Sequence, residues 1–226
     1  MHIMSIVLIV SSLLNLIIGI VVFSLNKKNK INQFLALTFL FIAIYNFSGA
    51  FYRDAMTESS VSLWAIVANI SGIFIAPAFF YFTVFFPYQK YKLTKLHNLV
   101  AAITSLGVIV FSFYWIEGAK LVEPTLSSGN AINDNLPARV YFLIFILAFS
   151  ILNYFNLFTK LIEAKEFAKK QLTFVTFGSL PFAIIGSIIG GILPYWNMDY
   201  FYLSPLSTSV FALVVAYFLF IYPKRT

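Results

Sequence analysis

The chain has 226 residues, of which 61% are hydrophobic and only 10% are charged, and its net charge is +7. Soluble domains are typically about 45–50% apolar and about 25% charged, so this composition excludes a soluble enzyme, a DNA-binding domain and a disordered chain. The sequence contains no cysteine, which excludes disulfides, thiolate metal sites and a cysteine nucleophile.

Long apolar segments follow one another along the whole chain. A membrane-spanning helix needs about 20 mostly apolar residues, with its backbone groups paired within the segment. The segments that qualify are 4–25, 33–52, 61–86, 98–116, 139–159, 172–193 and 204–222. We therefore expect an all-α fold, a polytopic bundle of seven transmembrane helices that forms one domain over residues 1–226. The first segment lacks a basic n-region and a cleavage site, so we expect a retained helix rather than a signal peptide.

The charges between these segments predict the orientation of the chain. Twelve of the 15 basic residues fall in the loops 26–32, 87–97 and 160–171 and in the C-terminal tail. The opposite side has three basic residues and six of the eight acidic ones. The positive-inside rule then places the N-terminus outside and the C-terminus in the cytoplasm of a plasma-membrane protein. The loop from Lys160 to Gln171 is expected to extend the fifth helix.

The sequence places no Asp, Glu, Lys or Arg in the interior of these segments, and it has no cluster with metal-ligand spacing. Ionisable groups inside a membrane usually mark ion or proton pathways, so their absence disfavours pumping, ion-coupled transport and retinal binding. We therefore expect no catalytic residue, no metal and no cofactor, and the chain is expected not to be an enzyme. Nucleic acid is not an expected partner.

Neutral polar side chains remain inside the predicted helices. Such groups commonly hydrogen-bond between helices, at about 0.6 kcal/mol each, and this is the simplest interpretation of Asn15 and of the other asparagines. A second interpretation is a small-ligand pocket with mostly apolar walls and a few polar groups. The candidate residues for this outward-facing pocket are Asn46, Tyr52, Trp64 and Asn69, with Tyr195 and Trp196 as a lid.

A small-residue motif lies in the sixth segment. Gly186 and Gly190 form a G-x-x-x-G in an apolar helix, which permits close approach of a second helix. Packing inside the bundle is the first interpretation of these glycines, and a homodimer face is the second.

The third, sixth and seventh segments resemble a known family. Pro77 is followed by an aromatic run and a closing Phe86-Pro87, and Lys169-Lys170-Gln171 precedes Gly178, Leu193-Pro194, Leu203–Leu206 and Ala216-Tyr217. This order resembles the N-terminal seven-helix sensor region of bacterial histidine kinases. The resemblance implies a membrane input module whose last helix normally leads into a kinase, while this sequence carries no phosphoacceptor histidine or ATP-binding lobe after it.

Three functions follow as hypotheses. The first is a stand-alone sensory module in the bilayer that responds to an extracellular or membrane-borne ligand and acts through a separate kinase or response protein. The second is a small facilitative transporter, although the sequence lacks the Pro-Gln pairs of sugar facilitators and matching helix breaks in its two halves. The third is an assembly protein that binds another membrane protein through Gly186 and Gly190.

Overall fold

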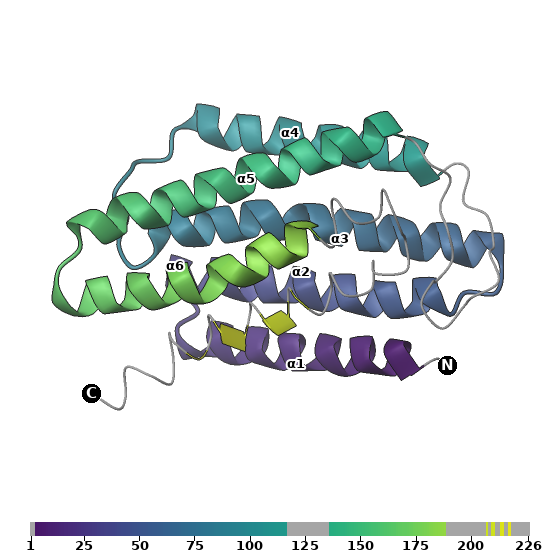
Figure 1. Cartoon of the computed structure of the whole chain (residues 1–226), viewed down its shortest axis with the longest axis horizontal. Helices are drawn as coiled ribbons and strands as arrows, with labels where there is room; N and C mark the ends of the chain where they lie inside the picture. The colour runs from purple at the N-terminus through teal and green to yellow at the C-terminus, as the bar shows by residue number, and fades with distance from the viewer. Residues whose placement is uncertain are drawn as a thin grey trace.

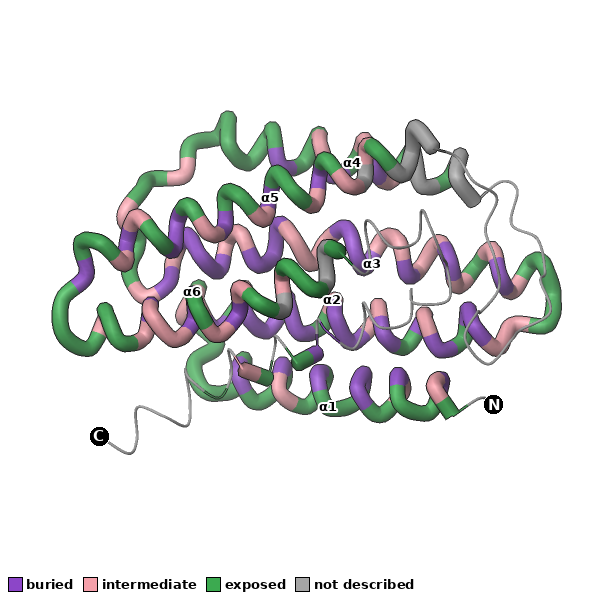
Figure 2. The backbone as a smooth tube through the Cα atoms, in the orientation of Figure 1, coloured by how far each residue is buried: buried purple, intermediate pink, exposed green. Residues whose placement is uncertain are grey.

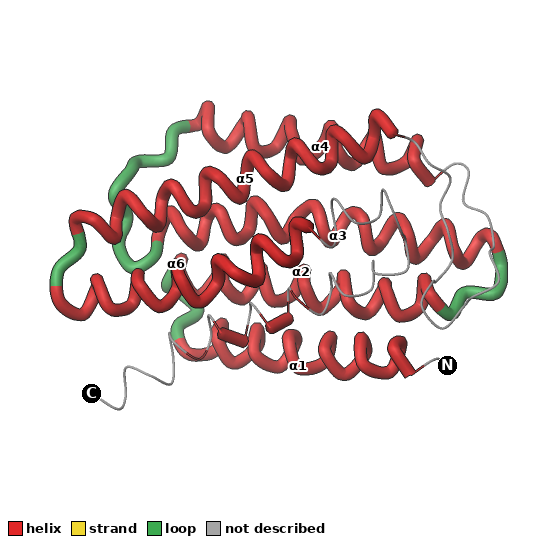
Figure 3. The backbone as a smooth tube through the Cα atoms, in the orientation of Figure 1, coloured by secondary structure: helices red, strands yellow, loops and turns green. Residues whose placement is uncertain are grey.

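A computed structural model describes residues 3–116 and 136–188 and, beyond them, Ser207, Ser209, Val210, Leu213, Val214 and Tyr217. The described part of the chain is helical and contains no strand (Figure 3). Its helices are α1 (Ile3–Leu25), α2 (Lys30–Arg53), α3 (Glu58–Phe85), α4 (Lys95–Ile116), α5 (Leu136–Glu163) and α6 (Glu166–Ser187). The predicted all-α class is therefore confirmed for these residues.

Four helices of the described residues are long and apolar enough to cross a membrane. They are Ile3–Leu25, Lys30–Arg53, Glu58–Phe85 and Leu143–Glu163, and Lys95–Val110 of α4 is a shorter apolar helix. The membrane character of the chain is thus supported by its structure, while the count of seven spans stays a prediction. Most of the predicted seventh span lies outside the described residues.

The helices form an elongated bundle around α3. Figure 1 shows α2 and α3 lying between α1 on one side and α4 and α5 on the other, with α6 crossing in front. The main core cluster joins residues of five helices, and Phe39 of α2, Phe82 of α3 and Leu157 of α5 are completely buried in it. Buried positions accordingly run along α2 and α3 (Figure 2).

Helix α1 has the burial pattern of a membrane helix. Its buried face carries Ser5, Ser11, Asn15 and Gly19, whereas large apolar side chains such as Ile17, which is 58% exposed, cover the outer face. In water this pattern would leave a large apolar surface unprotected. In lipid it lets small residues pack closely against the neighbouring helix.

Most helices begin about one turn earlier than the hydropathy boundaries predict. Asn29 caps α2, because its side chain accepts a bond from the Ile31 amide at 2.9 Å. Thr57 caps α3 in the same way, with the Ser60 amide at 3.2 Å. Polar caps of this kind pair with the free amides of a first helical turn. These two helices therefore begin with polar residues that a search for apolar segments leaves out.

Two buried charged side chains lie in helices, although both fall outside the apolar segments predicted from the sequence. α5 continues to Glu163, which confirms part of the predicted extension of the fifth helix, but the chain then turns at Ala164 and Lys165 and α6 begins at Glu166. Lys160 is therefore a residue of α5, and it is completely buried. Arg53 is likewise the last residue of α2 and is buried. The candidate spans of the structure are longer than the predicted segments, so Arg53 and Lys160 lie within them.

Candidate functional site

A cluster of polar side chains joins α1, α2 and Ser209. We call Ser11, Asn15, Asn46 and Ser209 the central polar cluster. The Asn46 side-chain amide donates to Ser209 Oγ at 2.7 Å and to Ser11 Oγ at 3.2 Å. The Asn15 amide donates to Ser209 Oγ at 2.9 Å, and the Ser11 hydroxyl donates to the same oxygen at 2.6 Å. The cluster therefore links the C-terminal part of the chain to the first two helices.

The donors and acceptors of this cluster do not match. Three donors point at Ser209 Oγ, although a hydroxyl oxygen has only two lone pairs. At the same time Asn15 Oδ1 and Asn46 Oδ1 are buried and have no hydrogen-bond partner among the described residues. A buried polar atom without a partner costs about 1–3 kcal/mol. A turn of either amide that let its oxygen accept from a serine hydroxyl would relieve part of this cost.

Lys160 forms a second polar site at one end of the bundle. Its ammonium group donates to the carbonyl oxygens of Thr83, Val84 and Phe86 at 2.8, 2.7 and 2.8 Å. These carbonyls end α3, where the helix leaves acceptors unpaired and carries partial negative charge. We call this arrangement the lysine clasp. The Lys160 side chain of α5 caps the C-terminal end of α3, and each of its three ammonium protons has a carbonyl acceptor.

Aromatic and charged groups surround the lysine clasp. The ring centre of Tyr88 lies 5.7 Å from the Lys160 ammonium, and Lys90 forms an ion pair with Glu163 at 2.5 Å. The hydrogen bond to Glu163 raises the pKa of the Lys90 ammonium above its usual value. A hydrogen bond with Thr159, and then one with Lys90, lowers the pKa of Tyr91. The α3–α4 loop is thereby fastened to the end of α5.

A polar seam continues from the clasp along α5. Asn153 and Asn156 are buried on the same face of α5 as Lys160. The Thr83 hydroxyl donates to Asn153 Oδ1 and accepts from the Asn156 amide, both at 3.5 Å. These contacts are at the long limit of hydrogen bonding, so the clasp dominates the polar contact between α3 and α5.

The four predicted wall residues of the outer pocket lie on α2 and α3. Tyr52 is buried with Val61 and Ala65, and Trp64 packs against that cluster. The Trp64 ring also stacks on Phe51, with ring centres 4.9 Å apart. Asn46 instead belongs to the central polar cluster, whereas Asn69 is half-buried on α3. Two of the four wall residues thus meet, and a pocket that joins all four stays a prediction.

The remaining predicted residues fall partly outside the described chain. Tyr195, Trp196 and Gly190 lie outside the described residues, and Gly186 is placed only as a position in the last turn of α6. The Asn15 amide donates to Ser209 Oγ, and its role in helix packing stays a prediction. Among the described residues there is no group of three or more His, Cys, Asp or Glu side chains that could hold a metal ion.

Asn15 and Asn46 are recognisable in the sequence as separate polar residues, whereas their partners and the lysine clasp are not. A serine in an apolar helix is weak evidence for a polar site, because its hydroxyl can bond to the backbone of its own helix. Lys160 stands at the boundary of an apolar run, where a lysine is expected to face solvent. The spacing of Asn153, Asn156 and Lys160 on one helical face was the available signal. Comparisons of the chain with protein-family models, with curated proteins and with solved structures give no match.

Proposed function

We propose that the chain is a sensory membrane module in which a ligand changes the packing of the C-terminal segment against α1 and α2. The observation that carries this proposal is the mismatch of donors and acceptors in the central polar cluster. A sensor needs two helix arrangements of similar free energy, and a ligand that binds one of them better. The cluster supplies a contact whose alternative hydrogen bonds differ little in energy, and it involves the segment nearest the C-terminus.

The proposal includes seven membrane spans with the N-terminus outside and the C-terminus in the cytoplasm of a plasma-membrane protein. Three loops, 26–29, 86–94 and 164–165, lie at one end of the bundle, and the α2–α3 loop lies at the other (Figure 3). Lysines such as Lys28, Lys92 and Lys165 are exposed at the first end. This polarity supports the proposed orientation, and a separate kinase or response protein would meet the signal at that end.

The proposal can be tested by distances between two spin labels in vesicles. The chain has no cysteine, so labels attached at Lys92→Cys and Leu213→Cys are specific, and both native side chains are exposed. We expect two distance populations. Asn46→Leu, which removes one orphaned acceptor and its competing donor, should leave one population.

Asn32→Leu is the matched control. Asn32 is a buried asparagine of α2 whose amide donates to the Val22 carbonyl at 2.9 Å, away from the cluster. This variant should keep both populations. A single distance that Asn46→Leu leaves unchanged would contradict the proposal.

The two alternative functions have their own tests. Saturable flux of a small solute into proteoliposomes would favour the facilitative transporter over the sensor. For the assembly protein, crosslinking from the helix that carries Gly186 should give products with another protein, and purely intramolecular products would count against it.

A further inference from the structure

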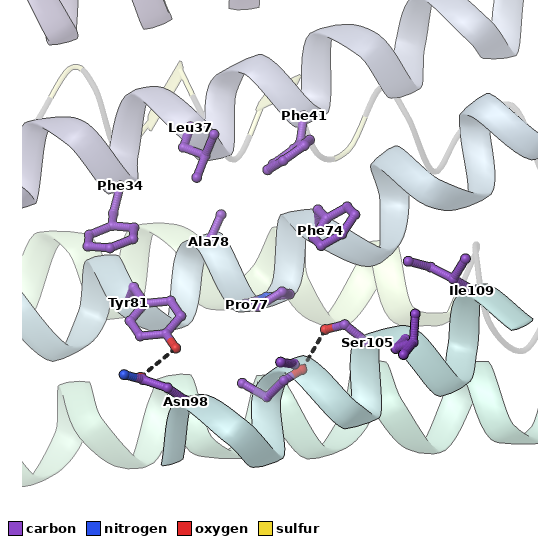
Figure 4. A pocket seen from close by; sticks show the side chains of 13 residues that line it. Phe34, Leu37, Phe41, Phe74, Pro77, Ala78, Tyr81, Asn98, Ser105 and Ile109 are labelled. Atoms are coloured by element: carbon purple, nitrogen blue, oxygen red, sulfur yellow. Dashed lines mark hydrogen bonds between the residues drawn. The ribbon is translucent and has the colours of Figure 1, made fainter. Parts of the chain in front are cut away.

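An apolar groove lies on the opposite side of α2 from the central polar cluster. Its cavity has a volume of about 500 Å³ and runs between α2 and α4, with α3 as its floor (Figure 4). The residues that line this α2–α4 groove are Phe34, Leu37, Phe41, Phe74, Pro77, Ala78, Tyr81, Asn98, Ala101, Ala102, Ser105, Leu106 and Ile109.

Small side chains create the groove. Ala78 and Ala101 are buried at its base, whereas aromatic pairs form its wall, with Phe41 stacked on Phe74 at 5.3 Å and Phe34 on Tyr81 at 5.0 Å. The hydroxyl of Ser105 is already bonded to the Ala101 carbonyl at 2.8 Å. Most of the groove therefore offers only apolar contact to an occupant.

The length of the groove matches the hydrocarbon thickness of one membrane leaflet. Along α4 it extends from Asn98 to Ile109, which is about 16 Å at the rise of an α-helix and about half of a 30 Å hydrocarbon core. It opens sideways, because Leu106 is 61% exposed and Ala102 is also exposed on its rim. An acyl chain could enter it from the bilayer without passing through water.

Polar and cationic groups gather at one end of the groove. The Tyr81 hydroxyl donates to Asn98 Oδ1 at 2.8 Å, as Figure 4 shows. Lys95 stands one turn before Asn98 at the start of α4, and Lys30 stands one turn before Phe34 at the start of α2. The Lys30 ammonium lies 4.9 Å from the Phe85 ring, which stacks on Phe34. Both lysines therefore flank the level at which a headgroup would lie.

We propose that the α2–α4 groove binds one acyl chain of an anionic phospholipid, with the phosphate held between Lys30 and Lys95. The charge of the polar end selects an anionic headgroup over a zwitterionic one, since a lysine near an anionic surface contributes about 1 kcal/mol. This inference rests on the proposed function in one respect, because it names a membrane-borne lipid as the ligand class of the sensor.

Photolabelling in vesicles tests the site. The full chain is placed in phosphatidylcholine vesicles that contain phosphatidylglycerol with a photoreactive group in its acyl chain. We expect labelled peptides from α2, α3 and α4 at the groove positions. Ala102→Phe fills the groove and should reduce that labelling to background, whereas Ala148→Phe, an exposed alanine of α5 outside the groove, should not.

A second pair of variants tests the headgroup without altering packing. Unlabelled phosphatidylglycerol should displace the probe from the groove better than phosphatidylcholine does. Lys30→Gln with Lys95→Gln should lose up to about 30-fold of this preference, which is the factor for two lysines at about 1 kcal/mol each. Lys169→Gln with Lys170→Gln, exposed lysines at the same end, should keep it.

Equal labelling of the wild type and Ala102→Phe, or equal displacement by both lipids, would overturn the inference. Neither result bears on the distance populations of the Lys92–Leu213 label pair. Failure of the lipid site and failure of the proposed sensor are therefore separate outcomes.

Discussion

The central polar cluster and the lysine clasp both bury polar groups between helices, but only the clasp matches its donors to its acceptors. Lys160 directs three protons at three carbonyl oxygens, all within 2.8 Å. In the cluster, three donors share Ser209 Oγ while two amide oxygens have no partner among the described residues. A fully paired site favours one arrangement of its helices, whereas the orphaned oxygens of an unmatched site would gain partners in another arrangement.

The difference assigns separate roles to the two regions. The clasp joins α3 and α5 and holds one end of the bundle as a rigid unit. The cluster joins α1 and α2 to Ser209, and under the proposed function a small shift there would exchange one set of hydrogen bonds for another. We infer that helix motion is confined to the cluster side, and four predictions test this contrast, from the largest expected effect to the smallest.

Removing the Lys160 charge should cost the most stability. Lys160→Met keeps the length of the side chain but leaves three carbonyls at the end of α3 unpaired, so the free energy of unfolding should fall by about 3 kcal/mol. Unfolding in mixed detergent micelles measures this change. Lys170→Met, an exposed lysine of α6, serves as the control and should be nearly neutral. Equal stability of the two variants would show that the clasp is not an anchor.

Close packing should stabilise the α1–α2 contact more than the cluster does. A Cβ atom at Gly19 would lie 3.1 Å from Phe39 Cβ and 3.3 Å from the Ala36 carbonyl oxygen. Gly19→Ala should therefore reduce stability by about 1–2 kcal/mol. At Gly49 the nearest atom is 3.9 Å away, so Gly49→Ala is the matched control and should not destabilise. A harmless Gly19→Ala would mean that the two helices separate easily.

Replacing the cluster amides should change stability little. Asn15→Leu combined with Asn46→Leu removes both orphaned acceptors together with their competing donors, and Ser11 can still bond to Ser209. The free energy of unfolding should change by less than about 1 kcal/mol, because apolar replacement of a poorly satisfied polar pair is nearly neutral. A loss as large as that of Lys160→Met would erase the contrast between the two regions.

The Lys90–Glu163 ion pair should contribute least, since it is partly exposed to solvent. The folded protein raises the pKa of Lys90 above its ordinary 10.5, chiefly through the hydrogen bond to Glu163. The contribution is therefore present below that ordinary value and is lost as the pH rises through the raised pKa. Lys90→Gln should be slightly less stable than the wild type at neutral pH and equal to it in strong alkali. A stability difference between Lys90→Gln and the wild type that grows with rising pH would contradict this prediction.

Hydropathy predicted the helical class and the approximate position of every described helix. It misplaced the ends because caps such as Asn29 and Thr57 are polar residues that begin helices. Hydropathy also ended the fifth predicted span just before Lys160, although this lysine is buried. Burial of this lysine depends on the end of α3, which is more than seventy residues away in the sequence, and no local pattern contains that contact.

The candidate site was predictable only in part for the same reason. Asn15 and Asn46 stood out as polar residues in apolar helices, and each was assigned separately. Their common partner, Ser209, is separated from them by 194 and 163 residues. Which of these groups meet, and whether their hydrogen bonds balance, follows from how the helices pack.

Relaxation dispersion of the asparagine side-chain amides tests the central claim most directly, because it detects exchange between states on the microsecond-to-millisecond scale. The protein is labelled at asparagine, and the signals are assigned with single variants. We predict exchange at Asn15 and Asn46, and none at Asn32, whose amide is bonded to the Val22 carbonyl. Static amides at Asn15 and Asn46 would show that the cluster has one arrangement and would contradict its role as a switch.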